Sequence, residues 1–268
     1  MIQYSVVIPM YNCESTIIDA VESVLNQTRY DLIDEIILVN DGSTDNSLDI
    51  IKSYIEKNKI SKVKIFTKEN GGAASARNYG IKISKNDYIA LLDSDDVWLK
   101  EKIEIQNEIL IENPQIKALG SNRIGEIKHH GEKVKANIYK LSVVDYCIKN
   151  WPCTPSLIFD KRIFKDNKFF DENMTHAEEG IFFLDLAYLS GLYYVDNELV
   201  LCGNGKPAFG HSGLSGNLKK MHKGVLKMHN LAFQKKYISI FNYMFFNAYE
   251  NLKFIRRIII VNRKDSNK

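Results

Sequence analysis

The chain is organised around the segment Tyr88-Ile89-Ala90-Leu91-Leu92-Asp93-Ser94-Asp95-Asp96-Val97-Trp98. It begins as a short apolar run, which is typical of a strand buried inside a parallel sheet. Three acidic residues then follow within four positions, and close carboxylates repel one another unless a cation joins them. In an extended segment Asp93 and Asp95 would point to the same side. We therefore expect a site for Mg²⁺ or Mn²⁺, shared with substrate phosphates, although an isolated D-x-D is more often a solvated acidic turn.

Three earlier apolar runs lie upstream of this stretch, at 5–8, 36–39 and 63–66, and each reads as a buried strand. We expect the first strand to stop at Pro9, which cannot donate to a ladder. Helical patterns separate the strands, so four strand–helix units predict an α/β fold with a doubly wound, mostly parallel sheet flanked by helices. Ligands of such sheets bind at the carboxyl ends of the strands. Asn12, Asp41 and Asp93 all follow a strand in this way.

The composition is that of an ordinary globular protein, with 268 residues, 45% hydrophobic and 26% charged. A net charge of +3 is too small to favour a nucleic-acid partner. The first residues have no signal-peptide layout. Cys13, Cys147, Cys153 and Cys202 include no C-x-x-C pair, and no reaction partner for Cys153 is identifiable. We expect reduced thiols in a cytoplasmic protein.

The first hundred residues contain five ordered motifs: Ser5–Asn12, Ser23–Thr28, Val39–Asp45, Gly71–Asn78 and Leu92–Asp96. Together they resemble glycosyltransferase family 2. The resemblance is strong over 2–98, looser over 100–202 and slight beyond. It implies a GT-A fold and inverting transfer of a sugar from a UDP-sugar, with Mg²⁺ or Mn²⁺, to a hydroxyl of a saccharide or lipid-linked acceptor. The implied setting is the assembly of cell-surface polysaccharide or lipopolysaccharide.

The resemblance also implies roles for residues of the donor site. Pro9 and Tyr11 would line the nucleotide base, with Asn12 in the same loop. Asp41 would accept a hydrogen bond from uracil N3–H, or it would cap the helix after Gly42. Arg77 would lie near the nucleotide or diphosphate, or it would pair with an acidic neighbour.

At the acidic stretch, the same resemblance places Asp93 and Ser94 at the nucleotide, with Asp93 contacting the ribose or the metal. Asp95 would ligate the metal. We expect Asp96 to begin a helix. His211, in a loop of small residues, would reach the metal or a phosphate, or it would be a surface histidine.

Two adjacent acids, Glu178 and Glu179, precede the apolar run 181–184. They resemble the family's Glu-Asp pair at a helix start, whose second acid is the general base. Here the second acid is a glutamate, so the base stays open between Glu178 and Glu179. Alternatively both acids only offset the helix dipole.

We divide the chain into a nucleotide-sugar-binding half (1–98), an acceptor-binding and catalytic-base half (99–216), and a C-terminal helical extension (217–268). The extension has an aromatic face but no apolar run of 18 residues, so it should not span a membrane. It either packs on the domain or lies peripherally at the inner face of the cell membrane. The basic residues near that face are Lys235, Lys236, Arg256, Arg257, Arg263 and Lys264.

Two other classes of protein remain as alternatives. A sugar-nucleotide nucleotidylyltransferase should carry a Gly-rich, Arg-containing loop after the first strand, where this chain has 9–12. A non-catalytic nucleotide-sugar-binding module would keep Asp41 and Asp95 but lack an acid in its second half, which Glu178 and Glu179 supply.

Overall fold

The computed structural model describes residues 2–126, 129–174, 176–203 and 217–265, with side chains as far as 261. The strands are β1 (Tyr4–Met10), β2 (Ile33–Asn40), β3 (Val63–Thr67), β4 (Tyr88–Leu91), β5 (Val97–Trp98), β6 (Ala118–Arg123), β7 (Glu132–Lys135), β8 (Ile138–Leu141), β9 (Ile158–Asp160) and β10 (Leu192–Leu201). The α-helices are α1 (Ile17–Leu25), α2 (Ser47–Asn58), α3 (Gly72–Ile83), α4 (Lys102–Glu112), α5 (Val143–Ile148), α6 (Glu179–Leu189), α7 (Leu218–Gln234) and α8 (Ile240–Asp265). Short 3-10 turns are η1 (Tyr30–Leu32), η2 (Thr154–Ser156) and η3 (Lys161–Ile163).

One sheet runs through the molecule in the order β3-β2-β1-β4-β9-β6-β10-β8-β7, and β5 pairs with β10. The first four strands in this order are parallel, which confirms the doubly wound sheet predicted from the strand–helix units. Beyond β4 the sheet is mixed, because β9 runs antiparallel to both β4 and β6 while β10 is parallel to β6. The parallel half therefore presents the carboxyl ends of β1, β2 and β4 at one edge.

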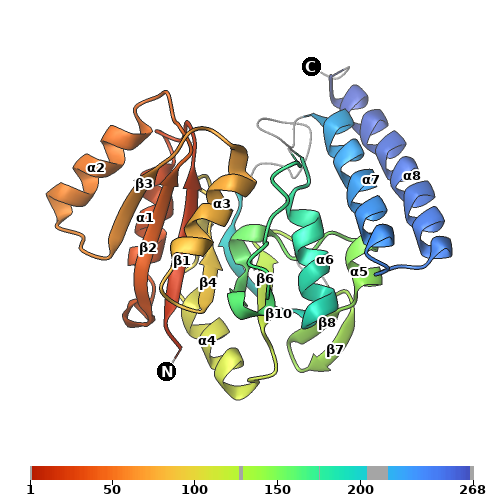
Figure 1. Cartoon of the computed structure of the whole chain (residues 1–268), viewed down its shortest axis with the longest axis horizontal. Helices are drawn as coiled ribbons and strands as arrows, with labels where there is room; N and C mark the ends of the chain where they lie inside the picture. Colours follow the sequence, from red (N-terminus) through yellow and green to blue (C-terminus); the bar gives the residue numbers. More distant parts are fainter. Residues whose placement is uncertain (1, 127–128, 175, 204–216, 266–268) are drawn as a thin grey trace.

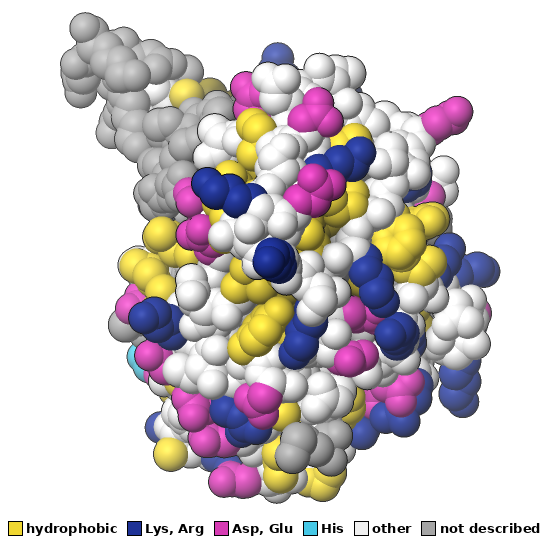
Figure 2. All heavy atoms as spheres, turned by 90° about the vertical axis from the view of Figure 1, so that its left-hand side faces the viewer, with side chains coloured by type: hydrophobic (Ala, Val, Ile, Leu, Met, Phe, Trp, Pro, Cys, Tyr) yellow, Lys and Arg dark blue, Asp and Glu magenta, His cyan; other side chains and the backbone are white. Residues whose placement is uncertain are grey.

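Helices cover both faces of this sheet (Figure 1). Side chains of α1, α2 and α4 share one apolar core with the sheet, and side chains of α3, α5, α6 and α7 share the other. The predicted apolar runs at 5–8, 36–39 and 181–184 all supply buried residues to the hydrophobic clusters. On the end of the molecule that carries α2 and β3, Figure 2 shows basic and acidic side chains interspersed, in keeping with the small net charge.

The expectation that β1 stops at Pro9 is wrong. The strand continues to Met10, and Pro9 pairs in register with Val39 of β2. Val7 accepts a hydrogen bond from Leu92 on the β4 side, so Pro9, two residues on, faces the side where pairing with β4 has ended. A proline is tolerated there because no ladder hydrogen bond is lost.

The C-terminal extension is a pair of helices, α7 and α8, which lie side by side beyond α6 (Figure 1). Phe246 and Glu250 of α8 are each 1% exposed, so one face of α8 packs firmly. Glu250 binds Arg257 at 2.8 Å and Lys253 at 3.0 Å. Among the described residues, no helix is long and apolar enough to cross a membrane.

Gly80 permits the close approach of α3 to the sheet. A Cβ at this position would lie 2.5 Å from Val7 Cγ1 and 3.2 Å from Val39 Cγ2. In an exposed helix Gly→Ala gains up to ~1 kcal/mol, but here we expect Gly80→Ala to cost ~1–3 kcal/mol because the core is overpacked. Urea denaturation decides the sign. A gain in stability would show that α3 does not rest on β1 as described.

Candidate active site

Arg77 of α3 connects the end of β4 with the start of α6. Its Nη2 donates to Asp93 Oδ1 at 2.6 Å, and its Nη1 donates to Glu178 Oε1 at 3.0 Å. Asp93 and Glu178 are far apart in the chain, yet one guanidinium holds both. The structure therefore brings three of the predicted site residues together.

The guanidinium of Arg77 is buried, with the residue 6% exposed, and it lies 5.3 Å from the centre of the Phe170 ring. Burial alone would lower the pKa of Arg77, but Asp93 and Glu178 raise the pKa above its ordinary value. A buried charge is tolerated only when it is paired and hydrogen-bonded. Of the two predicted roles for Arg77, pairing with acidic neighbours is the one that the structure shows.

The acidic residues after β4 form a turn instead of an extended segment. The Asp96 N–H donates to Asp93 O at 3.1 Å, so the expectation of an extended segment through Asp93 and Asp95 is wrong. Asp96 does not begin a helix either, because β5 follows it and α4 starts only at Lys102. Its buried carboxylate instead accepts a hydrogen bond from Gly203 N–H at 2.6 Å.

The three carboxylates of this turn repel one another. Burial, and then the charges of Asp93 and Asp95, raise the pKa of Asp96 to about 8. Such crowding of acidic oxygens favours a cation.

The carboxylate oxygens of the turn are suitable ligands for a hard divalent ion. Asp95 is exposed and Asp93 partly exposed, although Asp93 Oδ1 is engaged by Arg77. Within the described ranges, no group of three or more His, Cys, Asp or Glu side chains is arranged to hold a metal. Mg²⁺ commonly takes only one or two carboxylates and completes its shell with phosphates and water, so these residues fit an ion shared with a diphosphate. His211 lies outside the described residues.

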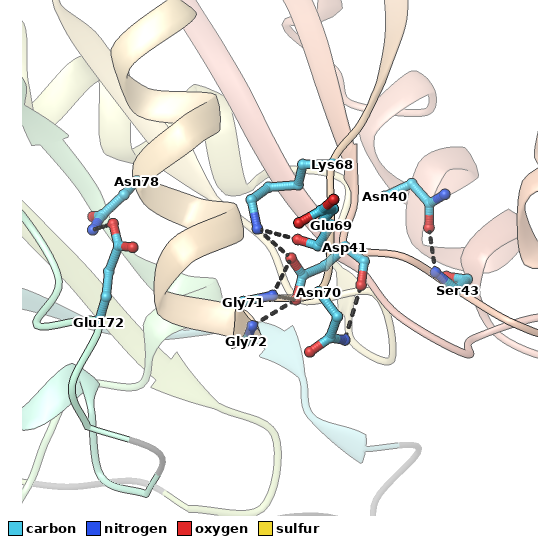
Figure 3. Close-up of polar contacts among 10 residues, drawn as sticks. All are labelled: Asn40, Asp41, Ser43, Lys68, Glu69, Asn70, Gly71, Gly72, Asn78 and Glu172. Atoms are coloured by element: carbon cyan, nitrogen blue, oxygen red, sulfur yellow. Dashed lines mark hydrogen bonds and ion pairs between the residues drawn. The ribbon is translucent and has the colours of Figure 1, made fainter.

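Asp41 holds the start of α3. Its buried carboxylate accepts from Lys68 Nζ at 2.7 Å, from Gly71 N–H at 3.0 Å and from Gly72 N–H at 2.7 Å (Figure 3). A carboxylate at a helix N-terminus satisfies backbone donors that have no partner within the helix. Asp41 therefore binds the N-terminus of α3 and does not cap the helix that follows Gly42, α2. Sequence reasoning missed Lys68 because a lone lysine after a strand carries no motif.

The loop after β1 is tied to the loop after β2. Asn12 has a positive φ of 47°, and its Oδ1 accepts a hydrogen bond from Thr44 N–H at 2.8 Å. Tyr11 beside it is 50% exposed, whereas Pro9 is buried within β1. Ser94 is partly exposed. Of these residues Tyr11 offers the largest surface to a ligand, and the predicted role of Pro9 stays a prediction.

The two adjacent acids have different surroundings at the start of α6. Glu178 is the N-cap, 6% exposed and bound to Arg77, and Glu179 is the first helical residue and partly exposed. Burial, and then the charge of Glu178, raise the pKa of Glu179 to about 7. Two carboxyl groups whose environments differ in this way are suited to different roles.

A second polar contact, which sequence reasoning also missed, fixes the segment before α6 (Figure 3). Asn78 of α3 donates to Phe170 O at 2.9 Å and to Glu172 Oε1 at 2.8 Å, and it accepts from Phe170 N–H at 2.9 Å. Arg77 and its neighbour Asn78 thus hold both ends of the segment that leads into Glu178.

Comparison with known proteins agrees with this geometry. The family model described as "Glycosyl transferase family 2" matches residues 5–165. The chain belongs to glycosyl transferase family 2. An uncharacterized glycosyltransferase of Haemophilus influenzae is 32% identical over 181 residues, covering 68% of this chain and 70% of the relative. Membership favours the transferase class over the nucleotidylyltransferase alternative.

Other relatives are longer than this chain. An uncharacterized glycosyltransferase of Rickettsia felis is 36% identical over 197 residues, which is 73% of this chain and 32% of the relative. The chain thus spans about a third of the length of such relatives. The chondroitin synthase of Pasteurella multocida is 45% identical over 101 residues, 38% of this chain and 10% of the synthase.

Solved structures confirm the GT-A fold of this family-2 chain. S. aureus TarS 1-349 in complex with UDP-GlcNAc aligns with a TM-score of 0.66 at 21% identity, over 85% of this chain and 66% of that one. The mannosyltransferase PcManGT from Pyrobaculum calidifontis, in complex with GDP-Man and Mn²⁺, aligns with a TM-score of 0.64 at 15% identity, over 87% and 64%. At these identities the likeness concerns the fold.

The raised pKa of Glu179 predicts a pH-dependent stability. Because its folded pKa of about 7 exceeds the unfolded value, this group's contribution to stability is present at low pH and is lost as the pH rises toward 7. We expect Glu179→Gln to melt at a higher Tm than the wild type at pH 8, and the difference to shrink at pH 5. The exposed Glu56→Gln in α2 is the matched control. Equal Tm differences at both pH values would contradict the raised pKa of Glu179.

Proposed function

We propose that this family-2 protein is an inverting glycosyltransferase that moves a sugar from a UDP-sugar to a hydroxyl of a saccharide or lipid-linked acceptor. The observation that carries the proposal is the double ion pair of Arg77 with Asp93 and Glu178, which sets an acidic turn beside a pair of acids at a helix start. An acidic turn is suited to a cation and diphosphate, and the acid pair supplies a base. The setting would be the assembly of cell-surface polysaccharide or lipopolysaccharide.

In this proposal residues 1–98 hold the donor, residues 99–216 supply the acceptor site and the base, and residues 217–268 support them. The Arg77–Glu178 ion pair joins the first two parts. A hexosyl or N-acetylhexosaminyl donor fits the class of neighbour whose structure contains UDP-GlcNAc. PcManGT contains GDP-Man, so GDP-sugars are the competing donors to be tested.

Asp41 would bind a nucleobase by exchanging one of its present hydrogen bonds. Its carboxylate, whose side chain is 3% exposed, accepts from Lys68 and Gly71 at Oδ1 and from Gly71 and Gly72 at Oδ2. Uracil N3–H would replace the longest of these contacts, that of Gly71 N–H with Oδ2 at 3.2 Å, with Tyr11 exposed in the loop after β1. A guanine base also carries an N–H donor, so preference for UDP has to be measured directly.

The chain's own residues would act on the donor and acceptor as follows. Asp95 and the second oxygen of Asp93 would hold Mg²⁺ or Mn²⁺. When bound, the ion would neutralise charge on the departing diphosphate. Arg77 orients Asp93 and Glu178. It thereby holds the donor-binding half and the acceptor-binding half of the chain in fixed positions relative to each other.

Glu179 would accept the proton of the acceptor hydroxyl as that oxygen attacks the anomeric carbon from the face opposite the diphosphate. A pKa of about 7 suits a general base at neutral pH, because the carboxylate is both available and basic. Glu178, bound to Arg77, would position the helix start instead of taking the proton.

The two acids can be separated by kinetics. Glu179→Gln keeps size and hydrogen bonding but removes basicity, so kcat should fall by about 10² or more while donor binding survives. Glu178→Gln is the matched variant and should act mainly on acceptor KM or on stability. Steady-state rates with a panel of UDP- and GDP-sugars, and nucleotide affinity measured separately, provide the test.

If Glu178→Gln is the inactive enzyme and Glu179→Gln is nearly normal, the base is the first acid. If both variants turn over normally, this helix start is not catalytic. No turnover of any nucleotide sugar by the wild type would favour a binding module over an enzyme.

We further propose that α8 contacts a membrane peripherally. Its outward side chains form an apolar stripe at helical spacing, with Phe241 80%, Met244 63% and Phe245 58% exposed. Leu252 and Ile255 continue it at 66% and 54%. Apolar stripes of this extent on a helix are typical of interfacial binding. The predicted basic flank is weaker than expected, however, because Arg257 pairs with Glu250, and Lys235 pairs with Asp185.

Substitution on the stripe tests this contact. Phe241→Ser combined with Phe245→Ser should weaken sedimentation with anionic lipid vesicles by at least about tenfold, because each buried Phe contributes ~1.5–3 kcal/mol. Ile111→Ser, which alters an exposed apolar residue of α4, is the control and should leave binding unchanged. A wild-type protein that ignores the vesicles would refute the membrane contact.

A further inference from the structure

Two cysteines that the sequence left without partners lie together in the fold. The Sγ atoms of Cys153 and Cys202 are 3.8 Å apart, although 49 positions separate them in the chain. Both residues are partly exposed, whereas Cys13 and Cys147 are buried. A disulfide bond is about 2.05 Å long, so an approach of ~1.8 Å would join the two sulfurs.

The two thiols differ in reactivity. The hydrogen bond from the Cys202 thiol, and then the Arg123 guanidinium, lower the pKa of Cys153. The pKa of Cys202 is raised, because the neighbouring Cys153 sulfur and burial both disfavour a second thiolate. The thiolate is the nucleophilic form of cysteine, so Cys153 is the attacking sulfur and Cys202 the resolving one.

We propose that Cys153 and Cys202 are a redox-modification site, which a hydroperoxide converts into a disulfide and a dithiol reductant restores. The Cys153 thiolate attacks the peroxide, takes one oxygen as a sulfenic acid, and releases water once a proton is added. The Cys202 sulfur then attacks the sulfenic sulfur, its proton leaves with the hydroxyl as a second water, and the S–S bond forms. Two thiols and one hydrogen peroxide thus give one disulfide and two waters.

The pair is connected to the acidic turn through one residue. Cys153 O accepts from Ser156 N–H at 3.1 Å and from Ser156 Oγ at 2.8 Å, which anchors this side on η2. Cys202 directly follows β10, and the next residue, Gly203, donates to Asp96 Oδ1 at 2.6 Å. Closing the disulfide therefore shifts Gly203 and, through it, the turn that carries Asp93 and Asp95.

The experiment treats the whole protein with hydrogen peroxide, alkylates the remaining thiols, and digests it without reductant. The wild type and the Cys147→Ser control should yield a linked Cys153–Cys202 peptide as the main product, and dithiothreitol should remove the link. Cys153→Ser and Cys202→Ser should yield none. Amide hydrogen exchange over 93–97 should change on oxidation of the wild type but not of Cys202→Ser.

Two results overturn the inference. If both thiols stay open to alkylation, or Cys153 is oxidised to sulfinic acid with no linked peptide, the pair is not a disulfide site. If the link forms and exchange over 93–97 is unchanged, the coupling to the acidic turn is refuted. Neither readout depends on glycosyl transfer, so failure of the proposed function leaves this test intact.

Discussion

A buried guanidinium with two acidic partners is the constraint on which the site depends. Arg77 is 6% exposed and binds Asp93 and Glu178 at 2.6 and 3.0 Å. Removing one partner of a buried ion pair costs ~3–5 kcal/mol, because the other charge is left uncompensated. The end of β4 and the start of α6 must therefore stay together wherever the fold is intact, which places an acidic turn and a candidate base in one site.

The same helix, α3, receives a second constraint at its start. Asp41 binds the backbone N–H groups of Gly71 and Gly72, so the carboxyl end of β2 fixes the helix whose next turn carries Arg77. Asn78 then holds the segment before Glu178. Polar groups thus link the ends of β2 and β4 to the starts of α3 and α6, while the apolar cores support the sheet beneath them.

Much of this could be predicted from the sequence, because it depends on local patterns. The apolar runs, which are separated by helical patterns, predicted the four parallel strands. The ends of these strands predicted the edge of the sheet at which Asp41 and Asp93 lie. The turn at Asp93–Asp96 could not be predicted, since its shape depends on Gly203, which lies 107 positions away in the chain. Lys68 and the Cys153–Cys202 pair were not predicted for the same reason, because a contact between distant segments produces no pattern in the spacing of residues along the sequence. The prediction that β1 stops at Pro9 was wrong because the rule against proline in a strand fails where the neighbouring strand has ended.

We propose that this edge of the sheet binds a nucleoside diphosphate through a divalent ion held by the acidic turn. The test is calorimetric titration of UDP into the wild type with Mn²⁺, into the wild type without metal, and into Asp95→Asn with Mn²⁺. We expect binding in the first case and an affinity lower by at least about tenfold in the other two, because a hard ligand or its ion has been removed. Equal UDP affinity in all three titrations would contradict it.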